Sequence, residues 1–522
     1  MNPAASGTAA PNVAQEPGVR VEPPDRYNAE LVQNAHPADW VNPTPQGRYN
    51  LVVIGAGTAG LVSAAIAAGL GARVALVERH LMGGDCLNVG CVPSKAIIRS
   101  SRIVADLREA AAYGIAGDGA AAADFAAVME RMRRLRSGIS PTDSVRRYAG
   151  LGVDVYLGKA RFSAPDAAQV DGATLRFKKA IIATGARAVA PPIAGLAEAG
   201  YLTNETVFSL TEPPRELVVI GGGPIGCELA QAFGRLGSRV TLVEAGPQCL
   251  GREDPDAAAV LAGVFEREGV RVLLGARVVR VTREGGRRVV HVEREAKPEA
   301  LPADQILVGV GRAPNVEGLN LEAAGVEYDR REGVRVSDAL QTTNPSIFAA
   351  GDICSRFKFT HTADFAARLA VQNALFPFLP KKKFSGLIIP WCTYTDPEIA
   401  HAGAHARELE KQGLEFETIK VPLSEVDRAI LDGEAEGFLK VHVEAKKGTI
   451  LGATLVARHA GEMISELTLA MVNGVKLGAI GGVIHPYPTQ AEVIRKAADQ
   501  WNKKRLTPGR KRLLAWVLAR LR

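Results

Sequence analysis

Two cysteines five residues apart are the part of the sequence with the clearest redox chemistry. Cys86 and Cys91 lie in the glycine-rich segment GGDCLNVGCVPSK, residues 83–95. A zinc site is not indicated here, because no second Cys or Cys/His pair stands at ligand spacing, and we predict no metal-ligating residues. A disulfide needs Cα atoms roughly 4.4–6.8 Å apart, whereas five residues of regular helix rise about 7.5 Å. A Cys86–Cys91 disulfide therefore requires a distorted helix, which Gly90 permits.

The cysteine content of the whole chain bears on the role of this pair. Six cysteines in 522 residues exclude a secreted scaffold held together by disulfides. A small disulfide ring in such a chain favours a catalytic over a structural role. We expect the other four cysteines to pack as small hydrophobic residues, and Cys392 stands where a new domain begins. These four are Cys227, Cys249, Cys354 and Cys392.

Two glycine-rich turns indicate a second kind of chemistry, the binding of dinucleotides. Each follows an apolar run that predicts a strand buried on both faces of a parallel sheet, residues 49–54 and 216–220. The first glycine makes the bend, the second lets the backbone approach a pyrophosphate, and the third lets helix and strand pack closely. The pyrophosphate then lies at a helix N-terminus, where unpaired N–H groups favour an anion. The two sets are Gly55, Gly57 and Gly60, and Gly221, Gly223 and Gly226.

An acidic residue follows each glycine turn at the same distance. Glu78 lies 23 residues after Gly55, and Glu244 lies 23 residues after Gly221. At the end of the next strand, such an acid can accept hydrogen bonds from ribose hydroxyls. Because Glu244 would repel a 2′-phosphate and no Arg follows closely, NADH is favoured over NADPH as the ligand of the second turn.

The elements that must position these residues indicate an α/β protein with several domains. A length of 522 residues suggests about three domains. The strand, glycine turn, helix and strand at 49–78 recur at 216–244, which indicates two copies of one nucleotide-binding unit rather than a solenoid repeat. Residues 386–500 have alternating strand-like runs followed by a helix around 461–473, which is typical of an α+β domain.

The charge of the chain is concentrated at its C-terminus. The net charge is +7, and residues 500–522 contain eight Lys or Arg and no acid, which leaves about −1 for the rest. A neutral body does not indicate nucleic-acid binding. No run of about 18 apolar residues exists, so we expect no membrane-spanning helix. Residues 503–522 predict a basic helix containing Trp516, which either lies on an anionic membrane surface or is a solvated charged end.

The cysteine segment also resembles a known active site. CLNVGCVPSK is similar to the redox centre of the class I pyridine nucleotide–disulfide oxidoreductases, a family that includes dihydrolipoamide dehydrogenase, glutathione reductase and mercuric reductase. The resemblance covers residues 49–500 in the family's order. It implies a flavoprotein with FAD at the first glycine turn and NAD(P)H at the second. Electrons would pass from NAD(P)H through FAD to a redox-active Cys86–Cys91 disulfide.

The same resemblance implies roles for individual residues. Cys91 would lie against the flavin as the charge-transfer thiolate, and Cys86 would be the outer, interchange thiol. Lys95 would lie near flavin N5, with Glu228 as its ion-pair partner beside the nicotinamide. In KFTHTAD, His361 either approaches the flavin ring or only begins a helix. Further FAD motifs of the family match Thr184 and Gly185 in IIATGA, and Gly351 and Asp352 in IFAAGDI.

One motif near the C-terminus departs from the family pattern. The disulfide reductases have His-x-His-Pro-Thr-x-x-Glu, in which the second His comes from the partner subunit as acid–base and the Glu orients it. This chain has Tyr487 at that position, preceded by His485, and it retains Glu492. Tyrosine has an unperturbed pKa of about 10, against about 6.5 for histidine, so it cannot easily take a proton from a thiol near pH 7. His485 either substitutes for it or is a structural histidine.

The tyrosine makes the chain similar to mercuric reductase, because a soft metal ion needs thiolates more than a proton donor. The pair of C-terminal cysteines that mercuric reductases carry has no counterpart, since no Cys follows Cys392. We predict an FAD-dependent NAD(P)H oxidoreductase that is mercuric-reductase-like. The alternatives are dihydrolipoamide dehydrogenase or another disulfide reductase and, in a different class, a membrane-peripheral flavin redox partner. The physiological acceptor stays open between a small molecule and a metal ion.

Together these features predict a cytoplasmic homodimer with a role in cell redox homeostasis. The predicted fold has two Rossmann-like dinucleotide-binding domains and a C-terminal α+β dimerisation domain. Residues 1–20 lack an apolar core and are no secretory signal, so we expect a disordered leader. The predicted segments are 1–48 (leader and docking arm), 49–190 and 315–385 (FAD domain), 191–314 (NAD(P) domain), 386–500 (interface domain) and 501–522 (basic tail).

Overall fold

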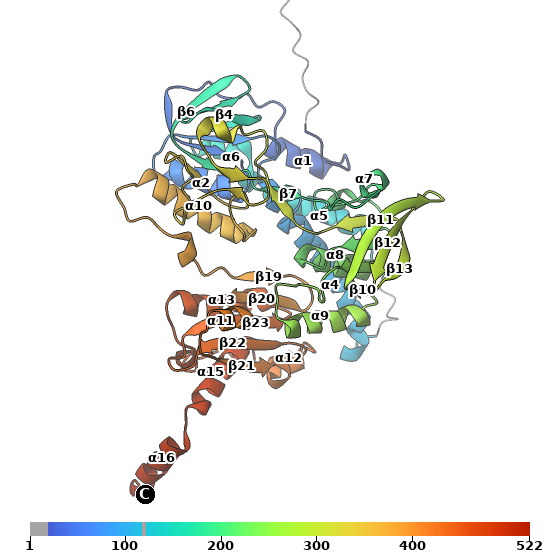
Figure 1. Ribbon diagram of the computed structural model, residues 1–522. Helices are drawn as coiled ribbons and strands as arrows, with labels where there is room; N and C mark the ends of the chain where they lie inside the picture. The colour runs from blue at the N-terminus through green and yellow to red at the C-terminus, as the bar shows by residue number, and fades with distance from the viewer. Residues whose placement is uncertain (1–18, 117–121) are drawn as a thin grey trace, which may run out of the picture.

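A computed structural model describes residues 19–116 and 122–522 (Figure 1). Two of its sheets are parallel nucleotide-binding sheets and a third is antiparallel, and each lies in its own part of the molecule. The predicted fold class is confirmed, with two Rossmann-like α/β domains followed by an α+β domain. Most of the predicted leader lies outside the described residues.

The first sheet surrounds the first glycine turn. Its strand order is β3-β2-β1-β6-β5-β4, with β18 added beside β6. Strands β1, β2, β3, β6 and β18 pair in parallel, and β4 and β5 form an antiparallel extension. Both faces of β1 are buried, since residues 51–54 face two separate hydrophobic clusters. The strands are β1 (Arg48–Ile54), β2 (Val74–Glu78), β3 (Val153–Leu157), β4 (Ala160–Ala164), β5 (Ala167–Val170), β6 (Ala173–Ile182) and β18 (Ile347–Ala349).

The second sheet surrounds the second glycine turn. Its four strands are all parallel, in the order β10-β9-β8-β14. A three-stranded antiparallel sheet, β11-β12-β13, lies beside it. The bounds are β8 (Glu216–Ile220), α8 (Pro224–Arg235), β9 (Arg239–Glu244), α9 (Pro255–Arg267), β10 (Arg271–Leu274), β11 (Ala276–Glu284), β12 (Arg287–Arg294), β13 (Lys297–Ala303) and β14 (Gln305–Val308).

The third sheet forms the C-terminal domain. Five strands pair antiparallel in the order β19-β20-β23-β22-β21. Two helices bury their apolar faces against this sheet, α13 on β20 and β23 and α15 on β21 and β22. The bounds are β19 (Trp391–Thr393), β20 (Glu398–Gly403), β21 (Phe416–Pro422), β22 (Phe438–Glu444), β23 (Ile450–Ala457), α13 (Ala460–Val472) and α15 (Glu492–Lys504).

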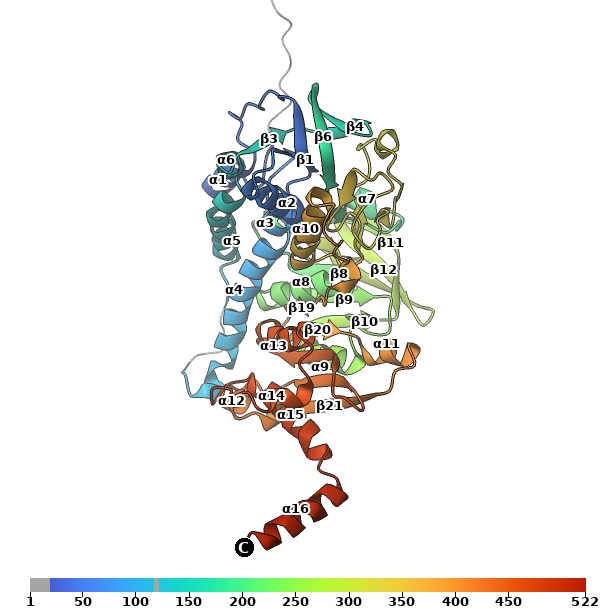
Figure 2. The same ribbon diagram turned by 90° about the vertical axis from the view of Figure 1, so that its left-hand side faces the viewer.

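Several helices connect these three parts. Helices α2 and α10 pack on each other over the first sheet, and the long helix α4 runs from that region toward the C-terminal domain (Figure 2). The N-terminal arm docks through α1, where Leu31 is buried and Trp40 Nε1 donates to the carbonyl oxygen of Val155 at 3.1 Å. The bounds are α1 (Arg26–Ala35), α2 (Thr58–Gly69), α3 (Gly84–Asn88), α4 (Cys91–Glu109) and α10 (Thr360–Leu375).

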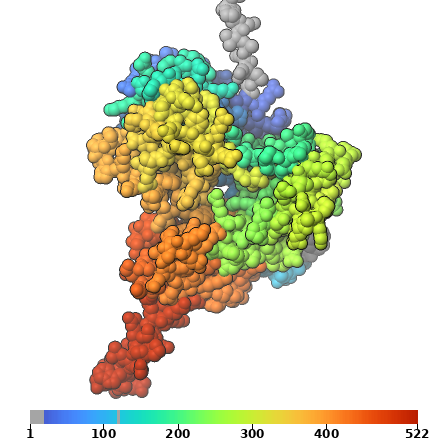
Figure 3. All heavy atoms as spheres, in the orientation of Figure 1, coloured from blue at the N-terminus to red at the C-terminus, as the bar shows by residue number. Residues whose placement is uncertain are grey.

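The last helix, α16 (Pro508–Arg520), projects away from the body of the molecule (Figures 1 and 3). Within the described ranges, no helix is both long and apolar enough to cross a membrane. The other described α-helices are α5 (Phe125–Ile139), α6 (Val145–Gly150), α7 (Leu196–Ala199), α11 (Ala406–Lys411), α12 (Asp427–Leu431) and α14 (Leu477–Ile480). The shorter strands are β7 (Ala186–Ala188), β15 (Arg312–Pro314), β16 (Tyr328–Asp329) and β17 (Gly333–Val334).

Candidate active site

The two cysteines stand on either side of a break between two helices. Helix α3 ends at Asn88 and α4 begins at Cys91, so the segment is not one regular helix. A Cβ on Gly90 would lie 2.7 Å from the carbonyl oxygen of Asp85, so this turn has room only for glycine. Both cysteines are thiols in the structure, and each thiol shifts the pKa of the other. The break therefore makes the two thiols neighbours.

The two thiols differ in acidity. The Cys86 thiol, Thr360 and Lys95 together lower the pKa of Cys91 to about 6, against the opposing effect of desolvation. The Cys91 sulfur, together with burial, raises the pKa of Cys86. At neutral pH, Cys91 therefore carries the negative charge and Cys86 keeps its proton. The thiolate is the nucleophilic and metal-binding form of cysteine, so Cys91 is the reactive member of the pair.

The start of α10 supplies a contact to this thiolate that the sequence did not predict. Thr360 Oγ1 lies 3.4 Å from Cys91 Sγ. The neighbouring His361 Nε2 lies 2.6 Å from the carbonyl oxygen of Pro390, and its ring stacks on Phe359 with 5.4 Å between centroids. Because a backbone carbonyl only accepts, His361 donates to Pro390 and anchors the helix start.

An ion pair connects the cysteine helix to the second nucleotide-binding helix. Lys95 Nζ, on α4, lies 2.8 Å from Glu228 Oε2, on α8. The other carboxylate oxygen of Glu228 accepts a hydrogen bond from the Tyr394 N–H at 2.9 Å, and the Lys95 ammonium lies 4.4 Å from the Tyr394 ring centroid. Burial opposes the charge on Lys95, but the Glu228 carboxylate prevails and raises the pKa of Lys95. The predicted pair forms, and Tyr394, just after β19, joins it to the third domain.

The glycine turns have matching geometry. Gly55 and Gly221 have φ values of +102° and +106°, in the left-handed region that glycine adopts without strain. A Cβ on Gly60 would lie 1.8 Å from the carbonyl oxygen of Gly55, and one on Gly226 would lie 1.9 Å from that of Gly221. The first and third glycines therefore pack against each other in both turns, as the bend and the close helix packing require.

The second glycine of each turn and the following acid also occupy equivalent positions. Gly57 and Gly223 are the N-terminal caps of α2 and α8, and neither cap position supplies a side-chain hydrogen bond. The first N–H groups of both helices can therefore bind an anion. Glu78 and Glu244 each accept a hydrogen bond from the N–H of the second residue of their turn, at 2.7 and 2.6 Å. Each carboxylate therefore holds the backbone of its glycine turn, and it lies where the ribose of a bound dinucleotide is expected.

The other predicted FAD residues meet at the carboxyl ends of two paired strands. Thr184 and Gly185 follow β6, while Gly351 and Asp352 follow β18. Burial raises the pKa of Asp352, while Arg312, 3.6 Å away, works in the opposite direction. In the described chain the buried Arg312 Nε lacks a hydrogen-bond partner. A buried carboxyl beside an unsatisfied guanidinium nitrogen fits a polar ligand such as the ribityl chain of FAD.

The C-terminal motif lies apart from the cysteines within one chain. Tyr487 is 71% exposed, and its hydroxyl donates to Asp427 Oδ2 at 3.0 Å, which raises the pKa of the tyrosine. His485 Nε2 lies 3.1 Å from the Glu466 carboxylate. Glu492 forms an ion pair with a neighbour on its own helix, Arg495. Among the described contacts, Glu492 touches neither His485 nor Tyr487, so the orienting role expected of it is not seen within a single chain.

The remaining four cysteines are not part of the redox pair. Cys227 and Cys249 are buried, and the Cys227 thiol donates to the carbonyl oxygen of Gly222 at 3.3 Å. Burial raises the pKa of Cys354 to about 12 and that of Cys392 well above its ordinary value. Such thiols stay protonated at neutral pH, which agrees with their expected packing role.

Comparison with known proteins identifies the family. Residues 49–367 match the family model "Pyridine nucleotide-disulphide oxidoreductase", and residues 389–498 match the dimerisation domain of the same family. The chain belongs to this family. Because the family uses FAD and NAD(P)H, the chain is an FAD-dependent pyridine nucleotide–disulfide oxidoreductase. The glycine turns and the Asp352 region described above fit these cofactors.

Individual relatives within the family carry different names. The chain is 34% identical to a mercuric reductase of Bacillus cereus over 87% of this chain and 72% of the relative. It is 35% identical to a dihydrolipoyl dehydrogenase of Thermus scotoductus over 87% of this chain and 98% of the relative. A solved structure of the HOCl-induced flavoprotein disulfide reductase of Escherichia coli superposes with a TM-score of 0.77 and 28% identity, covering 86% of this chain and 99% of that one. A Cu(II) complex of the same E. coli protein also has a TM-score of 0.77, at 27% identity.

Proposed function

We propose that this oxidoreductase reduces a thiophilic metal ion, in the manner of a mercuric reductase. For Hg(II), NADH gives up two electrons and becomes NAD⁺, Hg(II) becomes Hg(0), and one proton is released. FAD would be held at the Gly55, Gly57 and Gly60 turn and beside Asp352, and it would supply the electron transfer between NADH and the Cys86–Cys91 disulfide. The single observation that carries the proposal is Tyr487, because it replaces the acid–base that a disulfide substrate needs and a metal ion does not.

The cysteines and their neighbours have separate roles in this proposal. Cys91 provides a standing thiolate, since its pKa is about 6. Cys86 is the outer thiol, which loses its proton when a metal ion binds, because a ligating sulfur must be deprotonated. Lys95 holds positive charge near Cys91 and is itself held by Glu228. The environment thus favours two thiolates on one soft cation.

The tyrosine argues against efficient turnover of a disulfide substrate. Its hydroxyl donates to Asp427, and that carboxylate raises its pKa further above neutrality. His485 is engaged by Glu466 and has no hydrogen bond to a thiol among the described residues. A dihydrolipoamide dehydrogenase activity is the second candidate, supported by the 35% identity to a protein of that name. Cu(II) is a further metal to test, since the similar E. coli reductase forms a Cu(II) complex.

For the nicotinamide cofactor we propose NADH. The Glu244 carboxylate lies at the end of β9 and accepts hydrogen bonds from the N–H groups of Gly222 and Gly246, both at 2.6 Å. A carboxylate fixed in this way disfavours a 2′-phosphate at the adjacent ribose. A redox-active thiol pair that cycles with NADH fits a reducing compartment, which is why we propose the cytoplasm.

We further propose that the enzyme is a homodimer built through its dimerisation domain. Several large apolar side chains of this domain lie exposed on α13 and in the segment before α15. Leu469 is 65% exposed, Val472 is 63% exposed and Ile484 is 94% exposed. Tyr487 lies in the same segment, so a partner seated here would receive the tyrosine near its own cysteines. Apolar residues gathered in this way are typical of an interface between subunits.

We also propose that α16 contacts an anionic membrane surface. Its apolar residues follow Arg510, Lys511 and Arg512 directly, and none of the helix is buried. Leu513 is 60% exposed and Trp516 is 52% exposed. Basic residues beside exposed Trp and Leu are typical of helices that lie on lipid headgroups. In the alternative of a membrane-peripheral redox partner, this contact would be the main role of the protein.

The proposal is tested by measuring NADH and NADPH oxidation by the FAD-loaded enzyme with different acceptors. The acceptors are Hg(II) with excess thiol, Cu(II) with excess thiol, and oxidised lipoamide. We expect turnover with a metal ion that the Cys86→Ser variant loses by at least about a hundredfold, since the outer thiol is required. Fast, Cys86-dependent turnover of lipoamide with none of either metal would refute the metal-ion proposal and favour dihydrolipoamide dehydrogenase.

A further inference from the structure

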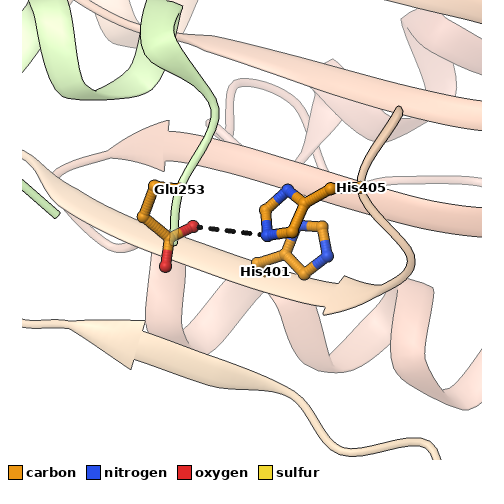
Figure 4. A group of neighbouring side chains, drawn as sticks. All are labelled: Glu253, His401 and His405. Carbon is orange, nitrogen blue, oxygen red and sulfur yellow. Dashed lines mark ion pairs between the residues drawn. The ribbon is translucent and has the colours of Figure 1, made fainter. Parts of the chain in front are cut away.

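Three buried side chains able to bind a metal meet where the second nucleotide-binding domain contacts the C-terminal domain. Glu253 lies in the loop before α9, His401 lies in β20, and His405 directly precedes α11. Their exposed fractions are 4%, 0% and 2%. One ligand atom from each lies within 4.8 Å of the other two, and Figure 4 shows the Glu253 carboxylate facing the stacked imidazoles. We propose that these residues form a site for a divalent transition-metal ion of the Zn²⁺ class, separate from the cysteine centre.

The polar atoms of this cluster are poorly satisfied by the protein alone. In the described structure, Glu253 Oε2 and His405 Nε2 lack a hydrogen-bond partner, while His405 Nδ1 lies close to Asp254. The other oxygen of Glu253 is held by Trp391 Nε1 at 2.6 Å. Buried polar groups normally have a partner, so unsatisfied groups that face one another call for a ligand. A cation accepts one lone pair from each of them.

The orientation of His405 suits metal binding. Its Nε2 lies 3.9 Å from Glu253 Oε2, and its Nδ1 lies 3.2 Å from Asp254 Oδ1. Metal-binding histidines commonly turn one nitrogen to the metal and the other N–H to a carboxylate. The Nε2 to Oε2 separation leaves space for an ion bound by both atoms, since bonds from Zn²⁺ to N and O are about 2.0–2.2 Å long.

His401 is held in a form of imidazole that can ligate a metal. Its Nε2 lies 3.1 Å from the carbonyl oxygen of Gly403, which only accepts, so Nε2 carries the proton. The lone pair is therefore on Nδ1, where the Thr454 hydroxyl donates to it at 2.8 Å. To ligate a metal ion, the His401 ring must turn away from Thr454, so that a metal bond replaces this hydrogen bond.

The surrounding charges also accommodate a cation. Lys440 Nζ lies 2.7 Å from both Asp254 and Asp256, and Lys420 lies 2.7 Å from Asp256. Two ammonium groups thus serve these two carboxylates and leave Glu253 without a positive partner other than His405. A buried carboxylate without such a partner is costly, and a bound cation removes that cost.

The donor set indicates which class of ion would bind. Two imidazoles and one carboxylate match zinc sites and are unlike the all-oxygen sites of Ca²⁺ and Mg²⁺. With donor bonds of about 2.1 Å, two ligand atoms are at most about 4.2 Å apart, so the cluster must close slightly around the ion. Such a site would join the loop before α9 to strand β20 and stabilise the contact between the two domains. The inference does not depend on the proposed acceptor.

The test uses the FAD-loaded, disulfide-oxidised enzyme, so that Cys86 and Cys91 cannot chelate. After dialysis against a chelator, the enzyme is titrated with Zn²⁺ alone by calorimetry, and bound zinc is counted by elemental analysis after desalting. We expect one Zn²⁺ per chain and a higher midpoint of thermal unfolding. His405→Ala should abolish binding. Glu253→Gln, which keeps the contact with Trp391, should weaken it at least tenfold. His291→Ala, on β12, serves as the matched control and should bind as the wild type does.

The outcomes separate a metal site from a buried polar network filled by water. Flavin content and NADH oxidation should be unchanged in Glu253→Gln, which shows that this variant is folded. Co²⁺ in place of Zn²⁺ should give a visible spectrum without a thiolate charge-transfer band. Failure of the wild type to retain Zn²⁺, equal retention by wild type and Glu253→Gln, or a thiolate band with Co²⁺ would each overturn the proposal.

Discussion

At the residue scale, the charge state of Cys91 governs the chemistry of the cysteine pair. The Cys86 thiol donates to it, Thr360 lies against it and Lys95 adds positive charge, and together they lower its pKa to about 6. Since an unperturbed cysteine titrates near 8.5, the wild-type protein has a thiolate here across the neutral range. Two of these three neighbours, Cys86 and Lys95, are close to Cys91 in the sequence, whereas Thr360 is 269 positions away.

A pH titration tests this balance of charges. In the FAD-loaded Cys86→Ser variant, whose hydroxyl still donates, alkylation of Cys91 by iodoacetamide should be half-maximal near pH 6 and fall below it as the thiolate is protonated. Lys95→Met removes a positive charge and should move the half-point upward. Glu228→Gln removes a negative charge and should move it downward. A shift of one pH unit corresponds to about 1.4 kcal/mol.

Mass spectrometry of the alkylated peptide assigns the reaction to Cys91 and excludes the buried cysteines. A half-point near 8.5 with no response to Lys95→Met would mean that the neighbours of Cys91 do not control its ionisation. Lys95→Arg is the matched control for charge, and we expect its half-point to stay close to that of the Cys86→Ser background, because the guanidinium keeps the positive charge.

At the scale of elements, α16 is the helix that contributes least to the folded body. Its seven-residue run LLAWVLA, residues 513–519, packs against no described part of the chain. A helix of this length is marginal in water unless something covers its apolar side chains. An anionic membrane surface provides both an apolar boundary and a negative charge for the basic residues that precede the run.

Removal of residues 508–522 tests the proposed membrane contact. The full chain should sediment with phosphatidylglycerol vesicles at low salt, and the truncated chain should stay in the supernatant with its NADH oxidation unchanged. Replacing Arg510, Lys511 and Arg512 with Gln should weaken binding about a hundredfold, since each basic residue near the surface contributes about 1 kcal/mol. Vesicles of neutral phosphatidylcholine are the control. Equal sedimentation of full and truncated chains would contradict the contact.

At the scale of the whole molecule, the separation of Tyr487 from the cysteines has a simple explanation. The tyrosine is 71% exposed on the surface of the dimerisation domain, in the same segment as the exposed Ile484. A second copy of the chain would cover this surface and would bring each tyrosine to the other subunit. The acceptor site would then be complete only in the dimer, whereas the two nucleotide sites lie within one chain.

Disruption of the proposed interface should separate the oxidation of NADH from the reduction of the acceptor. The wild type should have a mass of about twice 55.2 kDa in solution, and the double variant Leu469→Asp, Ile484→Asp should be a monomer. We expect the monomer to keep NADH oxidation with ferricyanide as acceptor. Its turnover of the proposed metal-ion acceptor, Hg(II) with excess thiol, should fall by at least about tenfold. Light scattering reports the mass. Leu70→Asp, an exposed residue of the FAD domain, should remain dimeric, and a double variant that stays dimeric would place the interface elsewhere.

The sequence by itself determined the features that depend on short stretches of chain. The glycine turns, the acids Glu78 and Glu244, and the cysteines on either side of Gly90 each belong to a local unit, so their spacing was enough to predict two nucleotide sites and a broken helix. The departure at Tyr487 was visible for the same reason, since its motif is continuous. The overall fold followed from the repeated strand and helix unit and from the family resemblance.

Only the tertiary structure decided which distant residues meet. Thr360 reaches Cys91 across 269 positions, and Tyr394 reaches Glu228 across 166 positions. The proposed metal site likewise joins His401 and His405, four residues apart, to Glu253 of another domain, and the sequence did not predict these ligands. The physical reason is that hydrogen bonds and charges act over a few ångströms in space, whereas spacing along the chain constrains only the neighbours within one element.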